Sequence, residues 1–250
     1  MTRFELIERA GRSEKFNGLC ALGIMTKAPE PGKVKTRLTP PLTSAEAAAL
    51  NVSFLRDLSR SIDVATDNAP ARGVAIYTPV GKESAYDDIL PNRFLMIPQR
   101  GENFGERLEL AVADLLDAGF GSVCLINSDS PTVPSANFAE AANELAKPGD
   151  RIVLGPSDDG GYYLIGLKKL HRRLFEEIDW STDQVLQQTL KRAQQVGVPV
   201  YRLPTGYDVD DQATLRRLCD ELLAGEKSTT APQTQQFLKQ IIAREGRARI

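Results

Sequence analysis

The chain has 250 residues, of which 42% are hydrophobic and 26% charged, so its composition is that of a globular protein long enough to bury a substantial core. Its formal net charge of −2 argues against a nucleic-acid partner or a polybasic membrane-binding surface, and any anion site must therefore be local. With a single histidine, His171, the chain lacks the residues for a His-rich zinc site.

Apolar runs alternate with helical patterns along most of the chain. Strands are predicted at 19–25, 73–79, 93–99, 122–128, 151–157, 162–167 and 199–204, and helices at 43–62, 103–119, 135–147, 181–197, 211–225 and near 233–244. This alternation predicts an α/β protein with a mixed, mostly parallel sheet and helices on both faces. The short interval between the fifth and sixth strands predicts one local antiparallel element. No internal repeat or low-complexity linker interrupts the pattern, so we expect a single domain over residues 1–250.

Two sequence patterns predict where helices begin. Thr43 with Glu46, and Ser181 with Gln184, have the spacing of a capping box, in which each side chain bonds the backbone of the other residue. We therefore expect a helix to begin immediately after each of the two cap residues.

Nothing in the sequence indicates insertion into a membrane or secretion. No apolar run approaches the roughly 18 residues of a membrane span, and the charged N-terminal stretch lacks the apolar core of a signal peptide. We expect a cytoplasmic protein with no membrane partner, whose cysteines, Cys20, Cys124 and Cys219, are reduced and buried. Either end of the chain could contact an identical chain, so a homo-oligomer is left open.

A cation-rich loop follows the first predicted strand. Residues 25–38 read MTKAPEPGKVKTRL and include Lys27, Lys33, Lys35 and Arg37. In open α/β sheets, ligands bind beyond the carboxyl ends of the strands, so this loop is placed to bind a polyanion. It is not a P-loop, because valine follows its Gly-Lys pair, and phosphate binding would therefore rely on Lys and Arg side chains. The alternative is a solvated basic turn.

Carboxylates follow two later strands. Asp129 comes directly after the strand at 122–128, where its oxygens suit Mg²⁺ or Mn²⁺; the alternative is a simple turn before the next helix. Asp208, Asp210 and Asp211 lie between a strand and a helix. A helix cap explains one of these carboxylates but not three, so we expect a second metal ligand among them.

A DDGG run joins the two strands that are expected to pair. Asp158 and Asp159 are followed by Gly160 and Gly161, which permit backbone conformations closed to other residues and close approach of a ligand. The alternative is a hairpin turn. The two interpretations are compatible, because the tip of a hairpin can also contact a substrate.

The loop that begins near residue 99 adds further candidates. Gln99 could hydrogen-bond a nucleobase, and Gly105 permits close backbone approach. The alternative is an ordinary loop and helix start. Trp180, the one tryptophan of the chain, is interpreted as a packing residue in preference to a stacking platform.

Taken in order, these motifs resemble a known family. The runs K-A-P-x-P-G-x-x-K-T-R-L, S-D-S-P, L-G-P-S-D-D-G-G-Y-Y-L-I-G-L, W-S-T and D-V-D are similar to those of bacterial GT-A-like transferases of the nucleotide-diphospho-sugar transferase superfamily, which are often labelled glycosyltransferases. A more distant similarity is to 2-phospho-lactate guanylyltransferase. The resemblance covers about residues 19–222, which leaves residues 1–18 and 226–250 as extensions.

The resemblance implies a Rossmann-like GT-A fold and a set of site residues. It implies that the loop around Lys27, Lys35, Thr36 and Arg37 binds the phosphates of a nucleotide, with Gln99 and Gly105 also on the nucleotide side. It implies that Asp129 and Asp210 hold Mg²⁺ or Mn²⁺, and that Asp158, Asp159, Gly160 and Gly161 face the acceptor substrate. The D-x-D motif usual in glycosyltransferases is absent at Asp129, where the sequence reads S-D-S.

Three functions remain open at this stage. In nucleotidyl transfer, a phosphorylated acceptor would attack an NTP, while Lys27, Lys35, Arg37 and a metal held by Asp129 stabilise the developing charge. In glycosyl transfer, a nucleotide-diphospho-sugar would donate its sugar to an acceptor hydroxyl, with Asp158 or Asp159 as the base. The basic loop and the S-D-S motif favour the first of these. The third function is a nucleotide-binding regulatory module without turnover.

Overall fold

The computed structural model describes residues 2–9, 11–224 and 230–250. Residues 1, 10 and 225–229 lie outside the described residues. They include the last position of the helix predicted at 211–225 and parts of both expected extensions. Among the described residues, no helix is long and apolar enough to cross a membrane.

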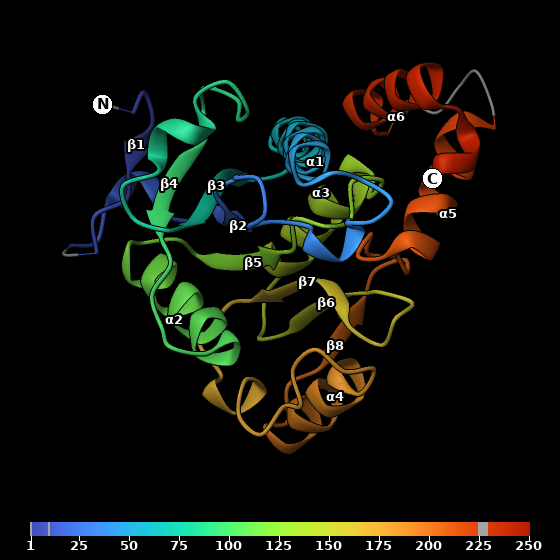
Figure 1. The fold of residues 1–250 in the computed structure, drawn as a ribbon. Helices are drawn as coiled ribbons and strands as arrows, with labels where there is room; N and C mark the ends of the chain where they lie inside the picture. The colour runs from blue at the N-terminus through green and yellow to red at the C-terminus, as the bar shows by residue number, and fades with distance from the viewer. Residues whose placement is uncertain (1, 10, 225–229) are drawn as a thin grey trace.

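A mixed sheet forms the centre of the molecule (Figure 1). Its described strands are β1 (Glu5–Leu6), β2 (Cys20–Lys27), β3 (Ala71–Thr78), β4 (Leu95–Pro98), β5 (Ser122–Ile126), β6 (Ile152–Pro156), β7 (Tyr162–Leu167) and β8 (Val200–Arg202). Their order is β1-β4-β3-β2-β5-β7-β6-β8, and β7 pairs antiparallel with both of its neighbours while every other pairing is parallel. The expected mixed, mostly parallel sheet and its local antiparallel element are thus confirmed.

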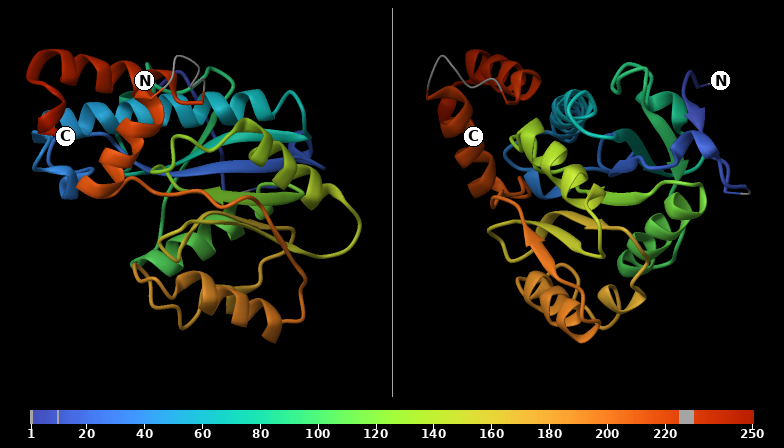
Figure 2. Two further views of the ribbon diagram at one scale, coloured as in Figure 1. Left: turned by 90° about the vertical axis from the view of Figure 1, so that its right-hand side faces the viewer. Right: turned by 180° about the vertical axis from the view of Figure 1, so that it is seen from behind.

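Helices cover both faces of the sheet (Figures 1 and 2). The six described α-helices are α1 (Ser44–Ala65), α2 (Phe104–Asp117), α3 (Ser135–Ala146), α4 (Val185–Gln195), α5 (Gln212–Leu223) and α6 (Pro232–Glu245). Alternation along β2 explains the two cores: Leu22 packs with α1 and α3 on one face, whereas Ala21 belongs to the cluster of α2 and α4 on the other. Successive strand residues face opposite sides, so continuous apolar strands require helices on both.

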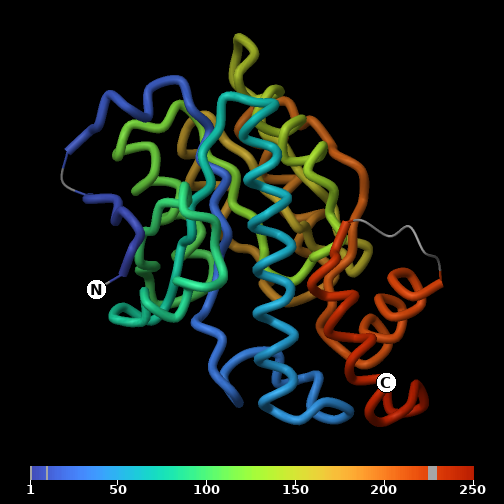
Figure 3. The backbone as a smooth tube through the Cα atoms, turned by 90° about the horizontal axis from the view of Figure 1, so that it is seen from above, coloured from blue at the N-terminus to red at the C-terminus, as the bar shows by residue number. Residues whose placement is uncertain are grey.

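A third apolar cluster joins α5 and α6 to the outer side of α1. The α6 helix lies beside α1 in the view from above (Figure 3). Asp57 of α1 is buried, and its carboxylate accepts hydrogen bonds from the backbone N–H groups of Gln233 (3.0 Å) and Thr234 (2.8 Å) at the start of α6. A side chain of one helix therefore satisfies the free N-terminal donors of another.

One predicted helix start is confirmed and one is wrong. Thr43 and Glu46 form the expected capping box at the start of α1. The helix predicted from residue 181 begins only at Val185, without a side-chain cap, and Ser181 has a left-handed backbone with φ 66°. The N–H of Leu186 donates instead to the carbonyl of Gly160, which holds the preceding loop against the β6–β7 hairpin.

Parallel pairing brings the carboxyl ends of most strands to one edge of the sheet. Backbone hydrogen bonds then join the loops at that edge. The N–H of Val209 donates to the carbonyl of Asp129 (2.9 Å), and the N–H of Asp158 donates to the carbonyl of Gly206 (3.1 Å). The carboxylate-bearing segments after β5, β6 and β8 are therefore held side by side.

Candidate active site

Two adjoining cavities open at this edge of the sheet. The larger has a volume of about 460 Å³ and the smaller about 390 Å³. They share a wall made of Arg37, Ser128, Asp129, Ser181 and Asp210. A molecule that reached across this wall would therefore touch both cavities.

Cations gather around the smaller cavity. Lys27, the last residue of β2, lines it together with Lys33, Lys35, Thr36 and Arg37 of the segment between β2 and α1. The segment is anchored because Leu38, the last residue of the short 3-10 helix Thr36–Leu38, is fully buried. All four predicted cations of this loop therefore converge on one cavity.

Lys35 is the one buried cation of the loop, with its side chain 5% exposed. Its Nζ lies 2.6 Å from the Asp129 carboxylate and 3.0 Å from that of Asp210, and it donates to the carbonyl of Val209 at 2.7 Å. Burial opposes the charged ammonium, but attraction by Asp129 and Asp210 is stronger and raises the pKa of Lys35. The ammonium thus stands between the two predicted metal ligands.

The two carboxylates fit a divalent cation in part. Both have an oxygen within hydrogen-bond distance of the same nitrogen, so they converge on a single cationic centre. Among the described residues, no group of three or more His, Cys, Asp or Glu side chains could hold a metal. Mg²⁺ and Mn²⁺ often take one or two carboxylates and complete their shell with water and substrate phosphates, which suits this pair beside the cationic cavity.

Asp208 is a further carboxylate in the wall of the larger cavity. Its Oδ1 accepts hydrogen bonds from Asn127 (2.8 Å) and Ser130 (2.6 Å) of the loop after β5, and from Ser157 (2.9 Å) of the loop after β6. Burial is the main cause that raises the pKa of Asp208 to about 6, and the neighbouring charge of Asp129 adds to it. Asp208 therefore links its own segment to the loops after β5 and β6 through hydrogen bonds from uncharged side chains.

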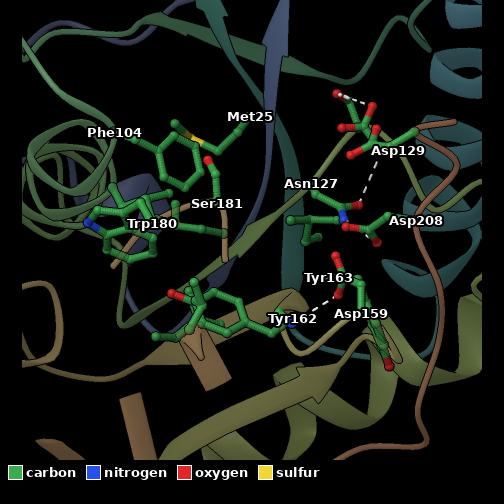
Figure 4. A pocket seen from close by; sticks show the side chains of 18 of the residues that line it. Met25, Phe104, Asn127, Asp129, Asp159, Tyr162, Tyr163, Trp180, Ser181 and Asp208 are labelled. Atoms are coloured by element: carbon green, nitrogen blue, oxygen red, sulfur yellow. Dashed lines mark hydrogen bonds between the residues drawn. The ribbon is translucent and has the colours of Figure 1, made fainter. Parts of the chain in front are cut away.

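The far side of the larger cavity is aromatic (Figure 4). Phe104 and Trp180 meet edge to face with ring centroids 5.2 Å apart, and Met25 lies beside them. Phe104 is 51% exposed, which is unusual for so large an apolar side chain. A Cβ on Gly105 would lie 2.5 Å from Nε1 of Trp180, so a glycine is required there for the ring to approach the helix.

The predicted acceptor-side residues are only partly at the cavity. Asp159 and Gly161 line the larger cavity, and the N–H of Gly161 donates to the Asp159 carboxylate at 2.9 Å. Asp158 forms an ion pair with Arg217 and lines neither cavity. Gly160 has φ 90°, and a Cβ there would lie 2.2 Å from the carbonyl oxygen of Asp183.

The two predicted residues on the nucleotide side that lie outside the basic loop, Gln99 and Gly105, line neither cavity. The Gln99 side-chain amide donates to the carbonyls of Thr26 (3.0 Å) and Ile76 (2.7 Å), and so ties the ends of β2 and β3 together. That Gln99 and Gly105 bind a nucleotide stays a prediction.

The sequence placed Asp208 among three candidates for the second metal ligand, but it did not predict the buried hydrogen-bond network of Asp208 or any of its donors. The D-V-D spacing was the available signal, because two acidic residues that flank one buried valine can both face a site from an extended segment. Ser157, 51 positions away, carried no comparable signal. Its role follows from the pairing of β6 with β8, which only the folded chain reveals.

Comparisons with known proteins agree with this fold. Residues 61–182, a little under half of the chain, match the family described as "Uncharacterized protein conserved in bacteria (DUF2064)". The chain is similar to a protein of Desulfovibrio desulfuricans G20 described as a "putative nucleotide-diphospho-sugar transferase", with 28% identity and a TM-score of 0.80 over 92% of this chain and 98% of that one. No curated protein matches the sequence.

Two more distant structures share the fold. One is CMP:2-keto-3-deoxy-manno-octonic acid synthetase complexed with CTP, at 11% identity and a TM-score of 0.53 over 84% of this chain and 100% of that one. The other is 4-diphosphocytidyl-2C-methyl-D-erythritol synthase of Anaerococcus prevotii DSM 20548, at 12% identity and a TM-score of 0.51 over 84% and 99%. The Rossmann-like fold and the resemblance to nucleotide-diphospho-sugar transferases are therefore confirmed.

Proposed function

We propose that this protein is a transferase that takes a sugar from a nucleotide-diphospho-sugar and passes it to the hydroxyl group of a second substrate. The observation that carries this proposal is the shared wall of the two cavities, which separates a cationic cavity from an acidic and aromatic one. The first suits the phosphates of a donor, and the second suits a hydroxyl-bearing acceptor. The reacting atoms would meet at the wall.

The donor half rests on the basic loop. Lys27, Lys33 and Arg37 can offset the charge of a diphosphate, and Arg37 also reaches the larger cavity. When bound, Mg²⁺ or Mn²⁺ would stabilise the charge that develops on the departing diphosphate. Asp129 and Asp210 are the residues that would hold it.

The acceptor half needs a proton acceptor. The acceptor oxygen would bond to the anomeric carbon, the bond from that carbon to the diphosphate oxygen would break, and a carboxylate would take the hydroxyl proton. Asp159 is favoured for this role over Asp158, because it lines the larger cavity whereas Asp158 is paired with Arg217. Asp208 would hold the surrounding segments in place.

Nucleotidyl transfer is a second candidate, supported by the number of cations at the smaller cavity. Four of them line it, which is ample for a triphosphate. In that reaction an acceptor phosphate would bond to the α-phosphorus of an NTP, and pyrophosphate would leave with the broken bond's electrons. The metal and the basic loop would have the same roles as in glycosyl transfer.

One assay separates the candidates. The protein is mixed with Mg²⁺ or Mn²⁺ and either nucleotide sugars or NTPs, each with a panel of hydroxyl and phosphorylated acceptors. Release of nucleoside diphosphate from a nucleotide sugar supports our proposal, and release of pyrophosphate from an NTP supports the second candidate. Asp129→Asn is expected to abolish either activity. Nucleotide binding that a chelator leaves unchanged, without turnover, would support a regulatory module instead.

A further inference from the structure

We infer that the acceptor carries no anionic group and is a hydroxyl compound with one apolar face, such as a neutral sugar or another cyclic polyol. This inference rests on the proposed function and names the substrate class of the larger cavity. Three observations carry it: the charges of the lining, the lack of partners for those charges, and the aromatic wall.

The charges of the larger cavity are unbalanced. Among the described residues that line it, Arg37 is the one cation, whereas five carboxylates line it: Asp129, Asp159, Asp183, Asp208 and Asp210. Two of these already face Lys35, and a divalent cation would neutralise the same two. The remaining three carboxylates outnumber the single cation of the lining, Arg37.

These three carboxylates have no cationic partner in the described part of the chain. Asp159 accepts from a backbone N–H, Asp183 accepts from the side-chain amide of Gln184 at 3.1 Å, and Asp208 accepts from neutral side chains. Their charge is therefore not cancelled by ion pairs. A phosphate or carboxylate brought into the cavity would meet like charge at close range, which costs binding free energy.

Hydrogen bonding points the same way. An ionised carboxylate only accepts hydrogen bonds, so a ligand must donate to it, and hydroxyl groups donate where phosphate oxygens do not. Opposite the carboxylates, the exposed face of Phe104 and the ring of Trp180 offer an apolar surface that can cover the C–H face of a cyclic polyol. The cavity therefore disfavours anionic ligands through charge repulsion, and it favours uncharged hydroxyl compounds through hydrogen bonds and apolar contact.

The electrostatic premise can be tested without a substrate. Trp180 is the one tryptophan of the chain, so its fluorescence reports on this cavity alone. We expect the caesium-to-iodide ratio of quenching constants to be at least about twofold higher than for free N-acetyltryptophanamide, because the carboxylates attract cations and repel anions. Asp183→Asn should reduce this ratio. The matched control Asp117→Asn removes an exposed charge that lines neither cavity and should leave the ratio unchanged.

The substrate class is tested with paired acceptors. Nucleotide sugars are offered with glucose or glucose 6-phosphate, and with glycerol or glycerol 3-phosphate, while release of nucleoside diphosphate is measured. We expect turnover with the uncharged members only, and Asp183→Lys should raise relative turnover of the phosphorylated members about tenfold or more. Equal or faster turnover of phosphorylated acceptors by the native protein would overturn the inference and leave the proposed function standing. If neither these acceptors nor any other member of the hydroxyl panel is used, the proposed function fails, and a caesium-to-iodide ratio below that of free N-acetyltryptophanamide would independently reject the inference.

Discussion

At the scale of single residues, Lys35 is the side chain on which the site depends most. It is buried, contacts two carboxylates and a backbone carbonyl, and comes from a different part of the chain than its partners. A buried cation between two carboxylates stabilises them only while all three groups are present. In the absence of a metal, this ammonium is the counter-charge that keeps Asp129 and Asp210 together.

Replacing Lys35 should change both stability and metal binding. In Lys35→Met the two partly exposed carboxylates lose their counter-charge, so we expect the free energy of unfolding without metal to fall by about 1–2 kcal/mol. Mn²⁺ should then bind about tenfold more tightly than to the native protein, because no ammonium competes for the pair. Urea denaturation and calorimetric titration measure the two effects.

The neighbouring Lys33→Met is the matched control, because Lys33 lines the same cavity but is exposed and makes no contact with either carboxylate. It should leave stability and Mn²⁺ affinity nearly unchanged. If Lys35→Met bound Mn²⁺ no better than Lys33→Met does, the two carboxylates would not form the metal site.

Asp208 should make stability depend on pH in an uncommon direction. Its folded-state pKa of about 6 lies above the ordinary value of an unfolded Asp, mainly because of burial. Its protonation therefore stabilises the fold, and this contribution is complete below the unfolded pKa and is lost as pH rises through about 6. Asp208→Asn imitates the protonated form, so the free energy of unfolding should rise by at most about 3 kcal/mol at neutral pH.

Urea denaturation at several pH values tests this prediction, and the gain should disappear near pH 4 or below, at roughly the unfolded pKa. Asp211→Ala is a control with the opposite sign, because Asp211 caps α5 and its pKa is lowered by the backbone and side chain of Thr214. That variant should lose about 1 kcal/mol at neutral pH. A loss of stability in Asp208→Asn at neutral pH would mean that the charged form of Asp208 stabilises the fold, contrary to the expected effect of its burial.

At the scale of secondary-structure elements, the packing of α6 depends on Asp57. Asp57→Ala leaves the first N–H groups of α6 without their acceptor, and this should cost about 2 kcal/mol. Hydrogen exchange should become faster at Gln233 and Thr234 and stay slow in β5. Asp57→Asn keeps an acceptor oxygen and should lose less. Unchanged exchange in Asp57→Ala would mean that the apolar cluster alone holds α6.

The β6–β7 hairpin depends on Gly160 in a comparable way. Gly160→Ala combines an unfavourable positive φ with a collision against the Asp183 carbonyl, so about 1–3 kcal/mol of stability should be lost. Because the loop of Asp183 also carries Trp180, the fluorescence maximum should shift as well. Gly161→Ala is the control, since its added Cβ would lie 3.2 Å from the mobile end of the Asp159 side chain. Identical spectra for native protein and Gly160→Ala would argue against this coupling.

Elements were predicted better than their junctions. Most of the predicted strands and helices are present because apolar runs and helical spacing are local signals. The start of α4 was wrong, because a capping-box pattern at Ser181 competes with a hydrogen bond between Leu186 and Gly160 that sequence spacing does not reveal. The two-residue strand β1 was missed, since both of its residues are exposed and form no apolar run.

At the scale of the whole molecule, the formal net charge of −2 conceals a division into two halves. Cations of one segment line the smaller cavity, and carboxylates from four segments line the larger. The loops that bear these residues could be located from the sequence, because each follows a predicted strand. Which residues of different loops meet could not, because the contact of Lys35 with Asp210 depends on strand order across the whole sheet.

The site residues are widely separated in the sequence, and this affects when the site can form during protein synthesis. Lys35, Asp129 and Asp210 lie in the first, middle and last parts of the sequence, and the hydrogen bond of Val209 to Asp129 forms only after both segments exist. A nascent chain that does not yet contain residue 210 therefore has Asp129 but lacks Asp210 as the second partner of Lys35. The complete cluster of Lys35, Asp129 and Asp210 can therefore assemble only after segments that are 175 positions apart have both been synthesised.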